Sequence, residues 1–212
     1  MMAMLGSAAA RTYQINSLPY TISVPGDYQL DRNLQSTSPT LITITADDVT
    51  LDLNGHTLSS TSSQYTIHVK SVQNVVIKNG SIRNPVVPLS PQPGGVGIFL
   101  DGSSGCLIKD VSISSKQEAV LDINGGNNLI KDCMISVYPS LKAAVSLQNT
   151  NGDLVEDNLI RCQQYGVLTE FHSPHAFNVI KGNVINVAGQ GGHSLEADFD
   201  IQNVVANDKA GG

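Results

Sequence analysis

The chain has 212 residues and a mass of 22.4 kDa, a size that indicates a single domain. Charged residues make up only 14% of it, against about 25% in an average globular protein, which argues against a charge-rich helical bundle or coiled coil. The formal net charge of -6 offers no basic surface for nucleic acid, and no stretch reaches the roughly 18 apolar residues of a membrane span.

The two ends of the chain differ from its centre. Residues 1–12 include three consecutive alanines, but they lack the basic start of a secretion signal. We interpret them as a disordered terminus or as the remnant of a tag or signal. Residues 13–46 are predicted to form N-terminal capping strands, and repeats occupy residues 47–206. The small or polar residues 207–212 predict a flexible tail.

A phrase of the form Ile-Lys-Asn/Asp-x-x-Ile recurs along the repeat region. Its seven copies begin at Leu53, Ile77, Ile108, Ile130, Val155, Ile180 and Ile201. The spacings are 24, 31, 22, 25, 25 and 21 residues. A second short run with alternating apolar residues precedes most copies, and such alternation predicts strands with one face inward.

The residues between the predicted strands favour left-handed turns. They form the column Gly55, Asn79, Asp110, Asp132, Asp157, Gly182 and Asn203. One copy of about two dozen residues cannot bury a face alone, so the copies must stack into a continuous core. A parallel β-solenoid fits better than a leucine-rich repeat, because neither a helix nor a Leu-x-x-Leu-x-Leu pattern is visible.

The segment Asp48-Val49-Thr50-Leu51-Asp52-Leu53-Asn54-Gly55-His56-Thr57-Leu58, preceded by Val24-Pro25-Gly26-Asp27-Tyr28-Gln29-Leu30, resembles the start of domains of the pectin-lyase-like superfamily. The later copies are similar to repeats of NosD-type and carbohydrate-active β-helix proteins. Over residues 20–206 this resemblance implies an all-β, single-domain right-handed parallel β-helix of about seven to eight coils. It also favours a secreted or cell-surface location.

Aligning the copies predicts which side chains stack in columns, because successive coils lie about 4.8 Å apart and alternate residues face opposite sides. The predicted inward columns are Ile67, Ile98, Leu121, Val145, Val167 and Leu195; Val69, Leu100, Ile123, Leu147, Thr169 and Ala197; and Leu58, Ile82, Ile113, Ile135, Ile160, Ile185 and Ala206. The predicted outward columns are His68, Phe99, Asp122, Ser146, Leu168 and Glu196; and Lys70, Asp101, Asn124, Gln148, Glu170 and Asp198.

The outward columns predict an acidic site near the later coils. The catalytic candidates are Glu170, Glu196 and Asp198, because paired carboxylates can serve as acid and base. The candidates for substrate binding are Asp101, Asp122, His172, His175 and His193. Oxygen and imidazole ligands would also suit a divalent cation such as Ca2+. The alternative interpretation is that exposed acids only keep the solenoid soluble and discourage edge pairing.

Four lysines occupy another predicted outward column, which Glu156 interrupts: Lys78, Lys109, Lys131 and Lys181. Such a stripe could bind a polyanionic chain, but we favour the interpretation that exposed lysines protect strands from aggregation.

The 31-residue spacing marks a proline-rich insertion at residues 84–95. It could form one wall of a groove beside Phe99 and Asp101, or be a plain surface loop. The three cysteines match no zinc pattern and are interpreted as small buried residues.

Two functions stay open at this point. The first is a β-helix that binds or processes a polysaccharide along an outward-facing sheet, as a lyase, an epimerase or a glycoside hydrolase. The second is a structural or oligomerisation module, or a fragment of a longer β-helix protein. No C-terminal cap follows Ala206, so we expect a homo-oligomer through the last coil or a longer parent chain.

Overall fold

A computed structural model describes residues 12–60, 64–85, 95–137, 140, 142–170, 177–189 and 192–197, together with 204–206 and 209–211. For 194–197, 204–206 and 209–211 it describes the backbone alone. Within these residues there are strands and turns and no helix, and hence no helix that is long and apolar enough to cross a membrane.

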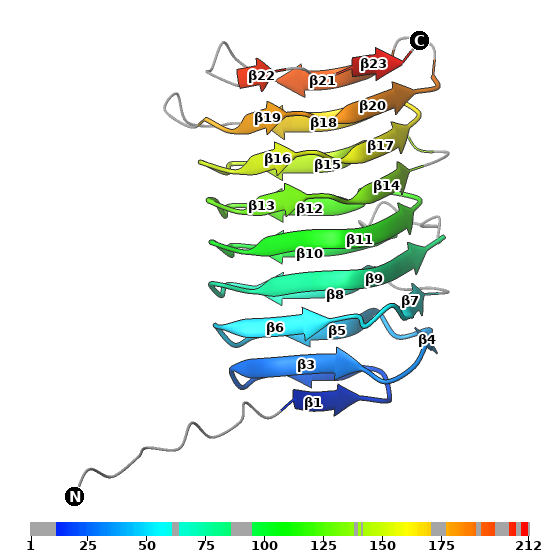
Figure 1. Cartoon of the computed structure of the whole chain (residues 1–212), viewed down its shortest axis with the longest axis vertical. Coiled ribbons are helices and arrows are strands. Elements are labelled where there is room, and N and C mark those ends of the chain that lie inside the picture. Colours follow the sequence, from blue (N-terminus) through cyan, green and yellow to red (C-terminus); the bar gives the residue numbers. More distant parts are fainter. Residues whose placement is uncertain are drawn as a thin grey trace, which may run out of the picture.

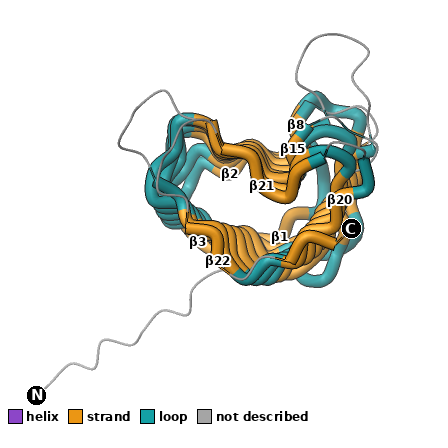
Figure 2. The backbone as a smooth tube through the Cα atoms, turned by 90° about the horizontal axis from the view of Figure 1, so that it is seen from above, coloured by secondary structure: helices purple, strands orange, loops and turns teal. Residues whose placement is uncertain are grey.

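The chain winds as a right-handed parallel β-helix whose strands pair in parallel from coil to coil (Figure 1). One side is an eight-stranded sheet made of β2 (Tyr20–Ile22), β5 (Thr40–Ile44), β8 (Tyr65–Lys70), β10 (Val96–Asp101), β12 (Val120–Ile123), β15 (Ala143–Gln148), β18 (Tyr165–Glu170) and β21 (His193–Ala197). Seen from above, the strands of successive coils surround a common interior (Figure 2). Buried apolar side chains fill this interior.

The other sides belong to a fifteen-stranded sheet with two rows. Its first row contains β1 (Thr12–Ile15), β3 (Gly26–Leu30), β6 (Val49–Asp52), β13 (Leu129–Lys131), β16 (Leu154–Glu156), β19 (Val179–Lys181) and β22 (Val204–Ala206). Its second row contains β4 (Leu34–Ser36), β7 (Thr57–Ser60), β14 (Met134–Val137), β17 (Leu159–Cys162), β20 (Val184–Val187) and β23 (Lys209–Gly211). Two long strands run through both rows: β9 (Val76–Asn84) and β11 (Leu107–Ser115).

The bend between the two rows is made by the predicted turn column. Asn79, Asp110, Asp132 and Asp157 have positive φ angles of 69°, 54°, 53° and 56°, and Gly182 follows with 68°. Asn and Asp tolerate this left-handed conformation better than other side chains, which is why the column contains little else. Asn203, the last member of the predicted column, lies outside the described residues.

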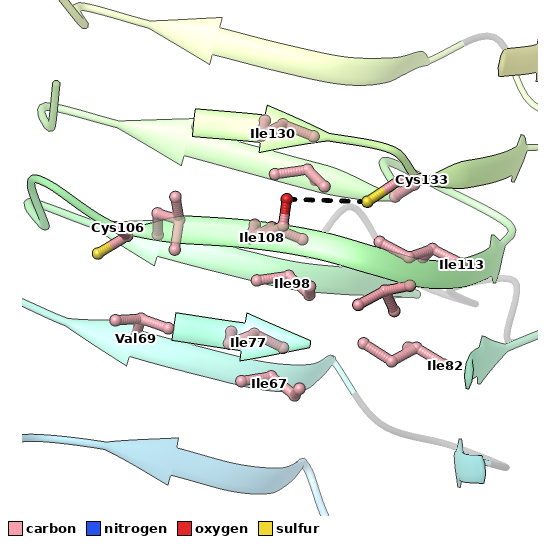
Figure 3. Packing of buried hydrophobic residues seen from close by; sticks show 14 of the residues in the cluster. Ile67, Val69, Ile77, Ile82, Ile98, Cys106, Ile108, Ile113, Ile130 and Cys133 are labelled. Atoms are coloured by element: carbon pink, nitrogen blue, oxygen red, sulfur yellow. Dashed lines mark hydrogen bonds between the residues drawn. The ribbon is translucent and has the colours of Figure 1, made fainter. Parts of the chain in front are cut away.

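Stacked aliphatic columns form the core, and Figure 3 shows part of it. The first row supplies Leu51, Ile77, Ile108, Ile130, Val155 and Ile180, and the second row supplies Leu58, Ile82, Ile113, Ile135, Ile160 and Ile185. All of these side chains are at most 1% exposed, and the second set confirms the predicted column up to Ile185. The three cysteines are buried as expected, and burial raises the pKa of each thiol to about 11.

The predicted register is wrong by one residue in β12. Val120, rather than Leu121, pairs with Ile98, and Asp122 pairs with Leu100. Because side chains alternate, this shift turns Leu121 and Ile123 to the outside and Asp122 to the inside. Asp122 is therefore fully buried instead of lying in an outward column.

Both ends of the repeat region consist of strands. The segment predicted as capping strands, 13–46, contains β2 to β5 and all of β1 but Thr12, and β1 pairs in parallel with β3 as later coils do. In the segment predicted as a flexible tail, Lys209–Gly211 forms β23 and places Ala210, not Ala206, beside Ile185. Most of the proline-rich insertion, 86–94, lies outside the described residues.

Buried polar side chains also stack, at the turns. The Oδ1 of Asn158 accepts a hydrogen bond from the Cys133 backbone N at 2.9 Å, and the Oδ1 of Asn183 accepts one from the Asn158 N at 3.0 Å. The Nδ2 of Asn158 donates to the Ile130 carbonyl at 2.9 Å. Each such side chain satisfies backbone groups of a neighbouring coil that could not reach water.

Ile135→Ala tests the core column with its neighbour as a control. Ile135 lies inward between Ile113 and Ile160, so truncation should lower the free energy of unfolding by about 2–5 kcal/mol. Met134 points outward from the same strand and is 53% exposed, so Met134→Ala should cost less than about 0.5 kcal/mol. Denaturant unfolding measures both values, and equal losses would contradict this register.

Candidate functional site

The outer face of the eight-stranded sheet brings several ring side chains together with the carboxyl groups of Asp101, Glu118 and Glu170. Alternation along the strands places two columns on this face, those that begin at His68 and at Lys70, and the ring contacts of Tyr65 with His68 and Phe99 place a third column beside them. They are Tyr65, Val96, Glu118, Ala143, Tyr165 and His193; His68, Phe99, Leu121, Ser146 and Leu168; and Lys70, Asp101, Ile123, Gln148 and Glu170. We call these columns the outer face.

A cluster of rings occupies the early part of the outer face. The ring centroids of Tyr65 and Phe99 are 4.9 Å apart, and those of His68 and Phe99 are also 4.9 Å apart and stacked. The Nε2 of His68 lies 3.1 Å from the Oδ2 of Asp101. Leu121 extends the apolar part of this cluster, which is separate from the main core. The cluster thus combines an apolar surface with a polar edge.

Glu118 is the carboxyl group with the most unusual environment on the outer face. It precedes β12, and its backbone O accepts a hydrogen bond from the Gly97 N at 3.1 Å. The residue is only 7% exposed, and burial raises the pKa of its carboxyl group, with a smaller raising effect from the charge of Glu170. The Nζ of Lys142 lies 4.0 Å from its Oε1 and acts in the opposite direction.

The charges of Asp101 and Glu118 both reach Tyr65. Burial is the main cause that raises the pKa of the Tyr65 phenol, and the charges of these two residues raise it further. The ring cluster, Asp101 and Glu118 therefore belong to one electrostatic environment. A carboxyl group whose pKa is raised by burial, with other carboxyl groups nearby, is an arrangement that acid–base catalysis uses.

The structure places part of the predicted site on this face. Asp101 and Glu170 share one outward column but are three coils apart, which corresponds to about 14 Å. Glu170 is near enough to Glu118 to affect its pKa. His193 is exposed and stacks on Tyr165 with a centroid distance of 5.9 Å.

Other predicted site residues lie elsewhere or are not described. Asp122 points into the core and cannot contact a ligand on the outer face. Only the backbone of Glu196 is described; it pairs with Leu168, next to the strand that carries Glu170. Asp198, His172 and His175 lie outside the described residues.

The described residues include no group of three or more His, Cys, Asp or Glu side chains arranged to hold a metal ion. That part of the chain therefore contains no set of ligands that fits the expected Ca2+.

Sequence reasoning missed Tyr65, Glu118 and Lys142. Glu118 comes before the alternating run of its coil, which begins at Val120. Alternation therefore does not predict whether its side chain points inward or outward. The signal that could have found it is the constant offset within each coil. Tyr65, Glu118 and Tyr165 all stand two residues before a member of one inward column, which is Ile67, Val120 and Val167 respectively.

The lysine column lies on the first row of the fifteen-stranded sheet and is charge-compensated. Lys181 Nζ is 3.0 Å from Glu156 Oε2, and Lys131 Nζ is 3.7 Å from Glu156 Oε1. Lys78 and Lys109 lie 3.8 Å from Asp52 and Asp110 respectively. This pairing supports the interpretation that the lysines are structural, because a site for a polyanion needs uncompensated charge.

Comparison with known proteins gives a consistent picture of the fold. The family model described as "right handed beta helix region" matches residues 65–211. An alginate lyase from Paenibacillus sp. superposes with a TM-score of 0.65 at 12% identity, over 97% of this chain and 78% of that chain. A tailspike protein of the E. coli bacteriophage HK620, crystallised with a pentasaccharide, superposes with a TM-score of 0.57 at 12% identity, over 95% of this chain and 51% of the tailspike. No curated protein matches the chain.

Lys142→Met tests the environment of Glu118. Since the Lys142 charge lowers the pKa of the Glu118 carboxyl group, its removal should raise that pKa further. Carboxyl-carbon NMR of the Glu118 side chain over a pH titration measures the change. Lys109→Met, on the other sheet, should leave the titration unchanged. An identical Glu118 titration in Lys142→Met and the unsubstituted protein would contradict the arrangement.

Proposed function

Because the chain belongs to the right-handed β-helix family, we propose that it binds or processes a polysaccharide along the outer face of its eight-stranded sheet. The observation that carries the proposal is the ring cluster of Tyr65, His68 and Phe99 beside two carboxyl groups in contrasting environments. The folds of an alginate lyase and of a tailspike crystallised with a pentasaccharide support it.

The outer face offers a sugar chain both kinds of contact that it needs. Apolar ring surfaces exclude water from the C–H faces of sugar rings, and side-chain oxygens and nitrogens bind hydroxyl groups. Tyr65 is partly exposed at the start of the face, and Gln148 and Glu170 lie partly exposed further along it. Because the coils repeat every 4.8 Å or so, a polymer lying across them meets similar positions again and again.

Glu118 is the proposed proton donor. Its raised pKa keeps the carboxyl group protonated to higher pH than an exposed glutamate, so it can give a proton to the oxygen of a glycosidic bond. Lys142 holds the carboxylate after the proton has left. Asp101 and Glu170 are the candidates for the base, which would take a sugar C–H proton in a lyase or an epimerase, or a proton from water in a hydrolase.

One observation favours the second function, a structural or oligomerisation module. Met134, Leu159 and Val184 form an outward aliphatic column on the second row of the fifteen-stranded sheet, and Met134 and Val184 are 53% and 42% exposed. Exposed aliphatic stripes of this kind favour self-association. Two copies could associate through this stripe or through their last coils. Light scattering over a range of protein concentrations tests this function. A monomer at every concentration would contradict it, because the stripe would then have no partner copy.

Glu118→Gln tests the proposed chemistry. The protein is incubated with alginate and with a neutral glycan such as amylose; new reducing ends report cleavage, and ultraviolet absorbance of an unsaturated product reports β-elimination. The substitution removes the donor proton but keeps the shape, so turnover should fall about 100- to 10,000-fold while binding persists. Glu156→Gln, on the other sheet, should leave turnover unchanged.

Binding is measured separately by calorimetry with oligosaccharides of the same two glycans. Tyr65→Leu should weaken binding, because it removes the exposed ring of the cluster. Failure of the unsubstituted protein to bind either glycan would count against the function. Normal turnover in Glu118→Gln would reject only the role of Glu118.

A further inference from the structure

Two carboxyl groups lie inside the solenoid, away from the outer face. Asp122 points inward from β12 and is 0% exposed, and Asp153, in the turn before β16, is 1% exposed. Isolated ionised carboxylates are very costly in such surroundings, and two of them side by side are more costly still. Asp122 and Asp153 are close enough for their side chains to hydrogen-bond to each other.

Asn128 connects the two carboxyl groups. Its Nδ2 donates to Asp122 Oδ2 at 2.6 Å and to the Ser103 carbonyl at 3.1 Å. Its backbone N donates to Asp153 Oδ1 at 2.8 Å. One oxygen of each carboxyl group receives a hydrogen bond from Asn128, and this fixes the positions of both groups.

The two remaining oxygens have no such donor. Asp122 Oδ1 and Asp153 Oδ2 are buried and accept no hydrogen bond from any other group. Buried oxygens without a partner are rare and call for an explanation. A single proton between the carboxyl groups would satisfy both oxygens and would remove one of the two buried charges.

We propose that Asp122 and Asp153 share one proton, which Asp122 carries and donates to Asp153, and that this proton makes the stability of the central coils depend on pH. Asp153 is the group that is ionised when the pair holds one proton, because the nearby Thr150 hydroxyl group favours its charged form. Asp122 has no second donor besides Asn128.

Within the described ranges, no cationic side chain contributes to the environment of the pair. The neighbours of Asp122 in its column are Leu100 and Leu147, which do not titrate. Among the described residues, the other titratable group facing the pair is the Cys106 thiol, whose backbone N donates to Asn128 Oδ1 at 2.8 Å. Burial raises the pKa of this thiol, and the charges of Asp122 and Asp153 raise it further, so it stays neutral.

The sign of the pH dependence follows from the direction of the shifts. Burial raises the pKa of Asp122 and of Asp153 above the ordinary value of about 3.9. Between that value and the raised values the folded state holds a proton that the unfolded state has lost. Raising the pH through this window therefore favours the unfolded state, so the stability that the shared proton provides is complete below about pH 4 and is lost progressively up to about pH 8.

Asp122→Asn tests the proposal, because asparagine resembles the protonated acid and can keep both hydrogen bonds. The Tm is measured from pH 4 to pH 9. Each pH unit in the window changes the folding constant of the unsubstituted protein by up to about tenfold, which corresponds to about 3–6 °C in Tm. Asp122→Asn should match the unsubstituted protein at about pH 4 and exceed it in Tm by a growing margin up to about pH 8. Asp157→Asn, at an exposed turn, should follow the unsubstituted protein throughout.

Infrared spectroscopy gives a second measurement that needs no folded variant. The unsubstituted protein at neutral pH should show the carbonyl stretch of a protonated carboxyl group, and this band should disappear on alkaline titration. Absence of the band, or an equal pH dependence of Tm in Asp122→Asn, would overturn the proposal. So would a rise in Tm with Ca2+ at pH 8 that Asp122→Asn abolishes, because the pair would then hold a cation instead of a proton.

Discussion

Parallel stacking at a repeat of about 4.8 Å is the constraint on which the rest of the structure depends. Every inward side chain lies directly above and below its counterparts, as in the column of Ile113, Ile135 and Ile160. Aliphatic side chains meet this constraint by packing. A polar side chain meets it only by bonding to the coil next to it, which is what Asn158 does between Cys133 and Asn183. The described interior therefore consists mainly of apolar columns, and the polar side chains within it, such as Asn158 and Asn128, are hydrogen-bonded.

The same constraint leaves the outer face free to vary. Tyr65, Glu118 and Tyr165 occupy equivalent positions in different coils, yet one is an acid and two are phenols. Because outward residues need not match their neighbours, chemistry can be added there without disturbing the core. This separation explains why the fold is compatible with many activities, and why the activity must be argued from the site and not from the fold.

The sequence predicts the solenoid well because its signal repeats. The turn residues Asn79 to Asp157 and the second-row column appear in every coil, and each copy supports the others. Coil register in β12 could not be predicted in the same way. The run Val120-Leu121-Asp122-Ile123 has apolar residues at both odd and even positions. Alternation alone therefore cannot predict which face of the strand lies against the core. Hydrogen bonding to Asn128 decides it, and that partner is visible only in three dimensions.

Glu118 and Asp122 lie four residues apart, and their positions connect the interior with the outer face. Glu118 lies near enough to the ring cluster for its charge to affect Tyr65, and Asp122 faces the core from the strand that follows. Burial is the main cause that raises the pKa of both. The same burial that suits Glu118 for proton donation in the proposed function therefore favours the protonated form of Asp122 in the folded state. One short stretch of chain thus carries the proposed proton donor on its outer side and a pH-sensitive contact on its inner side.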